Sequence, residues 1–157
     1  MHDISKQTNP RHSEIIGNIY VQFRNYLKGK RCKVFTDNID VYLDGGRHNF
    51  VVPDLSILCE PDKFSQSGYH GVPSLIVEVI SPSSTKVDRG MKFNLYESYG
   101  VPEYWLIDPL SGCVEQYVLQ DGNYMLLNVE YDEADRAGSI VPTIFDNLEI
   151  DIVDIFE

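Results

Sequence analysis

The sequence contains no long apolar run. Its longest runs, such as 75–77 and 105–107, have the length of strands, whereas a helix that spans a membrane needs roughly 20 apolar residues. The N-terminal residues Met-His-Asp-Ile-Ser-Lys-Gln-Thr are polar and do not resemble the apolar segment of a signal peptide. These absences argue against a membrane protein and predict a soluble, cytoplasmic one.

Cysteine is also scarce. The chain has only Cys32, Cys59 and Cys113, an odd number without the CxxC spacing of many metal and redox sites. Each lies in an apolar, strand-like context, where a free cysteine behaves as a small hydrophobic residue. We therefore expect three buried thiols without a metal or redox role.

Positive charge is deficient, with a net charge of −11. Proteins that bind duplex DNA usually present a basic face, because contacts to phosphates supply much of the affinity. Two features reduce the conflict with DNA binding. The acidic segments 130–135 and 146–157 can lie away from a site, and a metal ion can bring positive charge to a phosphate.

The composition is that of one folded domain. The chain has 157 residues, 43% of them hydrophobic, and ten tyrosines, which suits a domain with its own core and excludes a disordered chain. No internal repeat is visible. We expect a flexible arm over residues 1–10 and a single domain over residues 11–157.

The first half of the chain predicts one helix and several short strands. The apolar residues from Arg11 onward follow helical spacing, Ser13 is a candidate N-cap, and Gly29 is placed to end the helix. Short apolar runs separated by turn residues then predict three strands and an irregular loop. The strands are expected at 32–35 and 39–43 and along the extended stretch 49–59, which passes through Pro53-Asp54, and the loop is expected at 61–73.

The second half predicts a crossover. Ser74–Ile80 is an almost wholly apolar strand, Thr85–Tyr99 has the pattern of a helix ended by Gly100, and residues 103–107 form another strand. A helix between two buried strands is typical of a parallel βαβ unit. An Asp-Gly turn predicts a hairpin of 114–119 and 124–129, and 139–157 reads as a strand or extended flap. The fold class is therefore α/β (α+β), with a mixed central sheet flanked by helices.

Glu78 and Asp54 are the residues that suggest chemistry. Glu78 lies inside the most apolar strand, where an unpaired charge is costly, so it must be neutralised, paired or bound to a metal. Asp54 follows Pro53 at the start of another predicted strand. Two carboxylates on neighbouring strands suit Mg²⁺ or Mn²⁺, which also takes water and phosphate oxygens. The carbonyl of Val79 is a further candidate ligand. The alternative for Glu78 is an ordinary acid that faces a groove or an arginine.

A cation should accompany these acids if the reaction is phosphodiester hydrolysis, because negative charge develops on the phosphate. Position 80 is Ile, so no lysine follows Glu78 two residues later on the strand. Lys92 on the following helix is the better substitute and Lys86 the weaker one. Asp88, Lys92 and Tyr96 are spaced to share one helix face, a pattern equally typical of a surface ion pair.

A resemblance covers these residues, from about Arg11 to the C-terminus. It is carried by Val52-Pro53-Asp54-Leu55-Ser56, by the run from Pro73 to Ser84, by Asp88, Lys92 and Tyr96, and by Gly100-Val101-Pro102-Glu103-Tyr104-Trp105-Leu106-Ile107-Asp108-Pro109. In these motifs the sequence resembles the Uma-type family of proteins assigned as restriction endonucleases, within the PD-(D/E)XK nuclease superfamily. The resemblance implies the restriction-endonuclease-like fold.

The resemblance also implies roles for single residues. Asp54 and Glu78 would be metal ligands, and Lys92 would be a catalytic lysine that has moved from the strand to the helix. Glu14 matches an auxiliary acid of the superfamily, although an exposed helical Glu is the commoner explanation. Ser81 could contact a phosphate, although helix capping is the more ordinary reason for a serine there.

Other polar residues of the sequence have ordinary explanations. His12, His48 and His70 lack the spacing of metal ligands, so we expect them on the surface. Tyr104 and Trp105 lie in a predicted strand and are expected in the core.

The sequence therefore predicts a Mg²⁺- or Mn²⁺-dependent endonuclease that acts on DNA, with a homodimer as the expected assembly. One alternative is a binding or assembly module that retains the fold without activity, which the acidic charge favours. Another is a phosphodiesterase acting on RNA or a small substrate.

Overall fold

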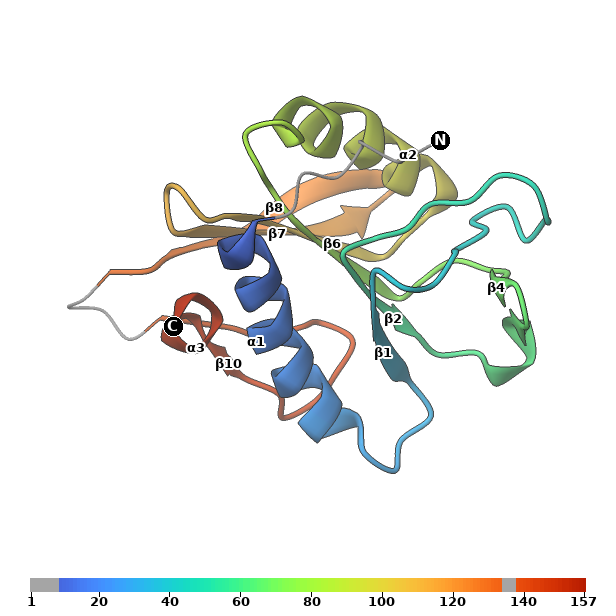
Figure 1. Cartoon of the computed structure of the whole chain (residues 1–157), viewed down its shortest axis with the longest axis horizontal. Coiled ribbons are helices and arrows are strands. Elements are labelled where there is room, and N and C mark those ends of the chain that lie inside the picture. Colours follow the sequence, from blue (N-terminus) through green and yellow to red (C-terminus); the bar gives the residue numbers. More distant parts are fainter. Residues whose placement is uncertain (1–8, 134–137) are drawn as a thin grey trace.

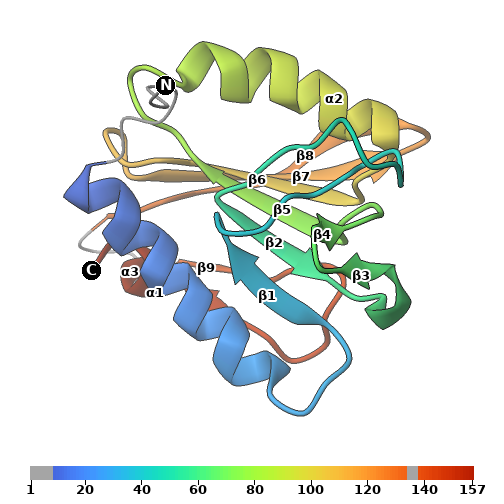
Figure 2. The ribbon, with the colours of Figure 1, turned by 45° about the vertical axis from the view of Figure 1, so that its right-hand side comes forward.

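The structure is a computed structural model that describes residues 9–133 and 138–157. A central sheet separates two layers of helices (Figures 1 and 2). Helix α2 covers one face of the sheet, while α1, α3 and the C-terminal segment cover the other. No helix of the described residues is long and apolar enough to cross a membrane.

The six strands of the sheet lie in the order β1-β2-β5-β6-β7-β8. All neighbours are antiparallel except β5 and β6, which are parallel and joined by α2. The predicted α/β class with a mixed sheet and a crossover helix is thus confirmed. The strands are β1 (Lys33–Thr36), β2 (Leu55–Leu58), β5 (Leu75–Val79), β6 (Glu103–Asp108), β7 (Cys113–Gln120) and β8 (Asn123–Tyr131).

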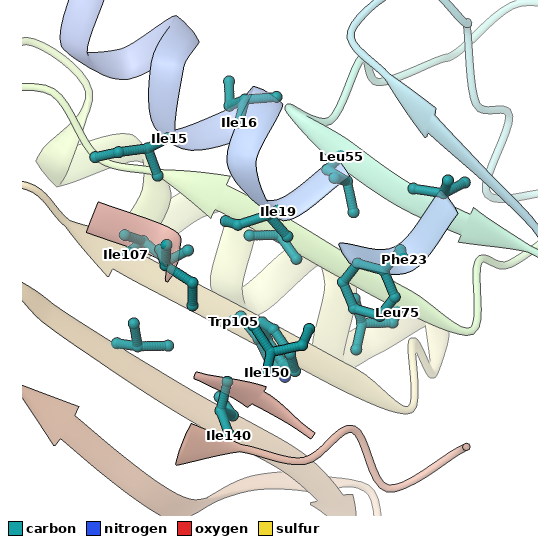
Figure 3. Packing of buried hydrophobic residues seen from close by; sticks show 14 of the residues in the cluster. Ile15, Ile16, Ile19, Phe23, Leu55, Leu75, Trp105, Ile107, Ile140 and Ile150 are labelled. Carbon is teal, nitrogen blue, oxygen red and sulfur yellow. The ribbon is translucent and has the colours of Figure 1, made fainter. Parts of the chain in front are cut away.

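Helix α1 (Pro10–Leu27) packs against the sheet through an isoleucine-rich face (Figure 3). It begins earlier than predicted, because the side chain of Asn9, rather than Ser13, caps it and accepts a hydrogen bond from the His12 amide. Gly29 follows the helix with a φ of +74°, as expected of a residue that ends a helix.

The crossover helix contains an irregular turn. A π-helical segment, η2 (Val87–Met91), precedes α2 (Lys92–Tyr99), and the helical conformation starts at Thr85 as predicted. Such π turns are rare and are frequent at functional sites. Gly100 ends the helix with a φ of +78°.

The predicted strand 39–43 and the first part of the predicted stretch 49–59 are not regular strands. In place of 39–43 and 49–52 the structure has a loop with isolated bridges from Val41 to Val51 and Tyr69. The loop predicted over 61–73 contains η1 (Pro61–Lys63) and the short pair β3 (Phe64–Ser65) and β4 (Gly68–Tyr69). The hairpin of β7 and β8 is confirmed, with positive φ at both Asp121 and Gly122.

The cysteine prediction was wrong for two of the three residues. Cys32 and Cys59 form a disulfide across β1 and β2. The register that pairs Lys33 with Leu58 places them opposite each other, a relation that the separation of 27 residues in sequence does not reveal. Cys113 is a buried free thiol, as expected.

The C-terminal segment is only partly extended. It forms the two-residue strands β9 (Ser139–Ile140) and β10 (Ile150–Asp151), which pair with each other, and then α3 (Ile152–Phe156), which was not predicted. Apolar residues of this segment join the core beneath α1.

A buried carboxylate fixes this segment to the sheet. Glu103 is fully buried and accepts hydrogen bonds from the Trp105 indole at 2.6 Å, the Gln116 amide at 2.9 Å, and both the amide and hydroxyl of Thr143. All four partners donate, so both oxygens of Glu103 are required as acceptors. Glu103 is therefore a structural acid, in contrast to Glu78.

We expect Glu103→Gln to lower the free energy of unfolding by about 2–3 kcal/mol, despite nearly unchanged volume. The new NH₂ group would face two donors and leave them unsatisfied in the interior. Urea denaturation measures this change, with the exposed Glu60→Gln as control, for which less than about 0.5 kcal/mol is expected. Equal stability of the two variants would contradict the structural role of Glu103.

Candidate active site

Asp54 and Glu78 lie side by side at one end of the antiparallel pair β2 and β5. The register that pairs Leu55 with Val77 brings Asp54, just before β2, opposite Glu78 near the end of β5. The Asp54 amide donates to Glu78 Oε1 at 2.9 Å, and the Val79 amide donates to Asp54 Oδ2 at 2.9 Å. Each carboxylate is thus held by a backbone amide of the other strand.

Lys92 reaches these carboxylates from the α2 layer. Its Nζ forms an ion pair with Glu78 Oε2 and a second one, at 3.1 Å, with Asp88 Oδ1. Asp88 belongs to the π turn η2 and is 1% exposed. The structure therefore brings together Asp54, Glu78 and Lys92, the three residues that the sequence singled out. The Asp88–Lys92 pair belongs to this buried cluster and is not a surface ion pair.

His12 was missed by the sequence analysis, which placed it on the surface. It is 6% exposed, and its Nε2 lies 3.3 Å from Asp54 Oδ2. It comes from the first turn of α1, so the site receives residues from both helical layers. Nothing in the spacing of the histidines indicates this contact, which depends on how α1 docks on the sheet.

The serines after β5 form a hydrogen-bonded turn that leads to the same cluster. Ser81 Oγ bonds to Ser83 and Ser84, and Ser84 Oγ donates to Asp88 Oδ2 at 2.8 Å. The Ser81 carbonyl accepts from Thr85 at the start of the helix. Ser81 thus shapes the turn and helps to hold Asp88 through Ser84.

Two weaker candidates do not join the cluster. Glu14 is exposed and forms an ion pair with Arg11, so α1 turns it away from the site that His12 faces. Lys86 is exposed on the helix. Val79 is linked to Asp54 through its amide, and the role of its carbonyl as a metal ligand stays a prediction.

Burial and like charges make Glu78 hard to ionise. Its removal from water, followed by the charge of Asp54, raises the pKa of Glu78 to about 8, and Lys92 opposes the shift. Burial alone would lower the pKa of Lys92, but Glu78 and Asp88 outweigh it and hold that pKa above its usual value. Lys92 is therefore charged at neutral pH, while Glu78 is largely protonated.

The net negative charge of the ionised cluster suits a divalent cation. The carboxylates of Asp54, Glu78 and Asp88, all at most 4% exposed, outnumber the single ammonium of Lys92 by two when ionised. Among the described residues no three His, Cys, Asp or Glu side chains form a ready cage for a metal. Mg²⁺ does not require one, because it binds through one or two carboxylates and keeps waters or phosphate oxygens.

A family model and several known proteins match the chain. The model of the Uma2 family, described as "Putative restriction endonuclease", matches residues 3–152. Two proteins of Synechocystis are similar: slr1290 is 32% identical over 127 residues, or 80% of this chain, and sll1609 is 30% identical over 91 residues, or 56% of it. The chain spans 65% and 51% of the lengths of these relatives, less than two thirds of each.

A solved structure shares the fold. It is a protein from Anabaena variabilis described as "a putative nuclease belonging to DUF820", which superposes with a TM-score of 0.73 at 21% identity. The match covers 96% of this chain and 83% of that one. The restriction-endonuclease-like architecture expected from the sequence is thereby confirmed.

The raised pKa of Glu78 predicts a pH-dependent stability. The unfolded chain releases this proton near pH 4.5 and the folded chain near pH 8, so the folded state binds more protons in between. Stability should therefore fall as pH rises from about 5 to 8 and then level off. The total loss should be several kcal/mol, because each tenfold difference in proton affinity between the two states is worth about 1.4 kcal/mol.

Urea denaturation in EDTA between pH 5 and 8.5 measures how the free energy of unfolding changes with pH. Glu78→Gln should make this free energy nearly independent of pH in that range. The exposed Glu14→Gln should show the same pH dependence as wild type. A Glu78→Gln variant with the wild-type slope would show that another group titrates in this range.

Proposed function

This chain belongs to the Uma2 family, and on that premise we propose that it is a divalent-metal-dependent endonuclease that hydrolyses phosphodiester bonds, with DNA as substrate. The observation that supports the proposal is the buried cluster of Asp54, Glu78, Asp88 and Lys92, in which three carboxyl groups surround one ammonium. When these carboxyl groups are ionised, their excess negative charge is destabilising unless a bound proton or cation compensates it.

Asp54 and Glu78 would hold the cation, together with the carbonyl of Val79. A bound Mg²⁺ or Mn²⁺ supplies Lewis acidity to a phosphate oxygen and activates water for attack. The two carboxyl groups are already oriented by the Asp54 and Val79 amides. This pre-orientation is what an electrostatically preorganised site requires.

Lys92 would stabilise charge on the phosphate. Its ammonium is held between Glu78 and Asp88 and keeps 24% of its side chain exposed, so a substrate can approach it from solvent. A charged donor placed where negative charge develops lowers the barrier of a hydrolysis. Because position 80 is isoleucine, the strand offers no lysine there, and the charge on the phosphate would be stabilised from the helix instead.

His12 would position Asp54. Its contact with Asp54 Oδ2 comes from the α1 side, while the Val79 amide contacts the same oxygen from the strand. Two contacts from different layers restrict the rotation of the carboxylate. Residues that orient a ligand typically change metal affinity by about 10–100-fold when they are removed.

Binding of DNA requires basic side chains near the site that are free to contact phosphates. Arg11 is bonded to Glu14 and the carbonyl of Phe156, and Arg89 forms a two-pronged pair with Glu115. These cations are therefore already engaged within the protein. RNA or a small phosphodiester, which needs a less extensive basic face, is the alternative that this observation favours.

We expect Asp54→Asn and Glu78→Gln to lose Mn²⁺ binding by isothermal titration and to reduce cleavage at least about 100-fold. Lys92→Ala should retain the metal and lose cleavage by a similar factor, since removing one charge-stabilising donor costs about 10²–10³ in rate. The assay uses plasmid DNA, RNA and bis(p-nitrophenyl) phosphate in parallel.

Lys86→Ala is the matched control, since Lys86 is exposed on the same helix, and it should cleave like wild type. A wild-type protein that binds neither Mn²⁺ nor Mg²⁺ would overturn the metal-dependent mechanism. Cleavage of RNA or of the small ester without DNA would replace the substrate.

The role of His12 has its own test. His12→Leu should weaken Mn²⁺ binding about 10-fold, whereas His12→Gln, which places an amide near the position of Nε2, should recover part of that loss. The exposed neighbour Ser13→Ala should bind Mn²⁺ like wild type. Equal affinity of the Leu and Gln variants would rule out orientation by the Nε2 contact.

A further inference from the structure

Three buried tyrosines form a layer between α2 and the sheet. Tyr96 comes from α2, Tyr104 from β6 and Tyr124 from β8, and none is more than 8% exposed. The Tyr96 and Tyr104 rings pack edge to face at 5.2 Å between centroids, and those of Tyr104 and Tyr124 stack at 5.9 Å. The rings therefore contribute to the core in similar ways.

The hydroxyl groups of the three tyrosines differ in their hydrogen-bond partners. Tyr104 donates to the Asp88 carbonyl at 3.0 Å, and Tyr124 donates to the Val101 carbonyl at 2.8 Å. The Tyr96 hydroxyl is buried and has no hydrogen-bond partner among residues 9–133 and 138–157. An unsatisfied buried hydroxyl is destabilising, and a phenylalanine would fill the same space. Folding alone thus gives no reason for this hydroxyl.

Helix geometry directs the Tyr96 hydroxyl toward the acidic cluster. Tyr96 follows Lys92 by four residues on α2, and helical side chains lean toward the N-terminus of their helix, which here is the end with Asp88 and Lys92. Burial raises the pKa of Tyr96 well above its usual value, and the charges of Glu78, Asp88 and Asp54 raise it further, in that order. The hydroxyl therefore keeps its proton at neutral pH and is available as a donor.

We propose that the Tyr96 hydroxyl binds a water molecule at the Asp54–Glu78 site and positions it against the Glu78 carboxylate. A buried water requires two to four polar partners. Tyr96 supplies the donor and Glu78 an acceptor, while the Tyr96 ring is packed in a cluster of buried apolar residues. The use of this water in hydrolysis rests on the proposed nuclease function, whereas its binding does not.

A high-resolution crystal structure tests the binding directly. Wild type should show an ordered water within hydrogen-bond distance of both Tyr96 Oη and the Glu78 carboxylate, and Tyr96→Phe should lack it. A water that remains in Tyr96→Phe would overturn the proposal, as would a Tyr96 hydroxyl that donates to a protein group in the wild-type crystal.

Solution measurements separate the positioning role from a structural one. Tyr96→Phe should keep or raise the wild-type Tm, because no protein hydrogen bond is lost, and should lower kcat for DNA cleavage at least about 10-fold at unchanged KM. Tyr124→Phe is the matched control from the same layer. It loses a satisfied hydrogen bond, so its Tm should fall by a few degrees while kcat stays that of wild type.

The failures of the two proposals are distinguishable. If Tyr96→Phe lowers the Tm as Tyr124→Phe does and leaves kcat unchanged, Tyr96 has a structural role and the positioning role is refuted. If wild type cleaves no phosphodiester, the nuclease function fails, and the crystallographic water alone then decides whether Tyr96 binds one.

Discussion

The site depends on one interaction, the exchange of hydrogen bonds between Asp54 and the end of β5. The Asp54 amide binds the Glu78 carboxylate while the Val79 amide binds the Asp54 carboxylate, so neither acid can move without the other. Carboxylates placed this way in an apolar sheet repel each other, and the pKa of Glu78 rises to about 8 as a result of this repulsion and, above all, of burial. The fold therefore keeps two buried carboxyl groups in an energetically unfavourable position. Such positions are more typical of functional acids than of structural ones.

The rest of the molecule supplies charges and donors to this arrangement from two sides. The crossover helix brings Asp88 and Lys92 over one face of the sheet through a π turn, and α1 brings His12 to the other side of Asp54. Glu103 shows the contrasting case, since four donors satisfy it completely. Two fully buried glutamates of one sheet thus differ in how completely their partners satisfy them.

The sequence predicted those features of the fold and the site that depend on residues close together in the chain. An acid inside an apolar strand, a crossover helix between two strands and an Asp-Gly hairpin are all visible in neighbouring residues, and these led to Glu78, Lys92 and the mixed sheet. The contact of His12, the disulfide of Cys32 and Cys59, and the four donors around Glu103 depend on docking and register between distant segments. No local pattern encodes those relations, so residue spacing suggested surface histidines and free thiols instead.

The charge distribution bears on the order of events at the proposed site. A phosphodiester is an anion. At the proposed site it would approach a cluster with more carboxyl groups than ammonium groups, on a protein whose net charge is −11. The dense basic segment of Lys28, Lys30, Arg31 and Lys33 ends on β1. There Lys33 pairs with Leu58, four residues along β2 from Asp54, which places it roughly 13 Å away at about 3.3 Å per residue. This distance exceeds the Debye length of about 8 Å at physiological salt, so the charges of that segment are largely screened at the carboxylates. Under the proposed function, the cation must therefore bind before the substrate, since only a cation at the carboxylates reverses the sign of the potential that a phosphate encounters.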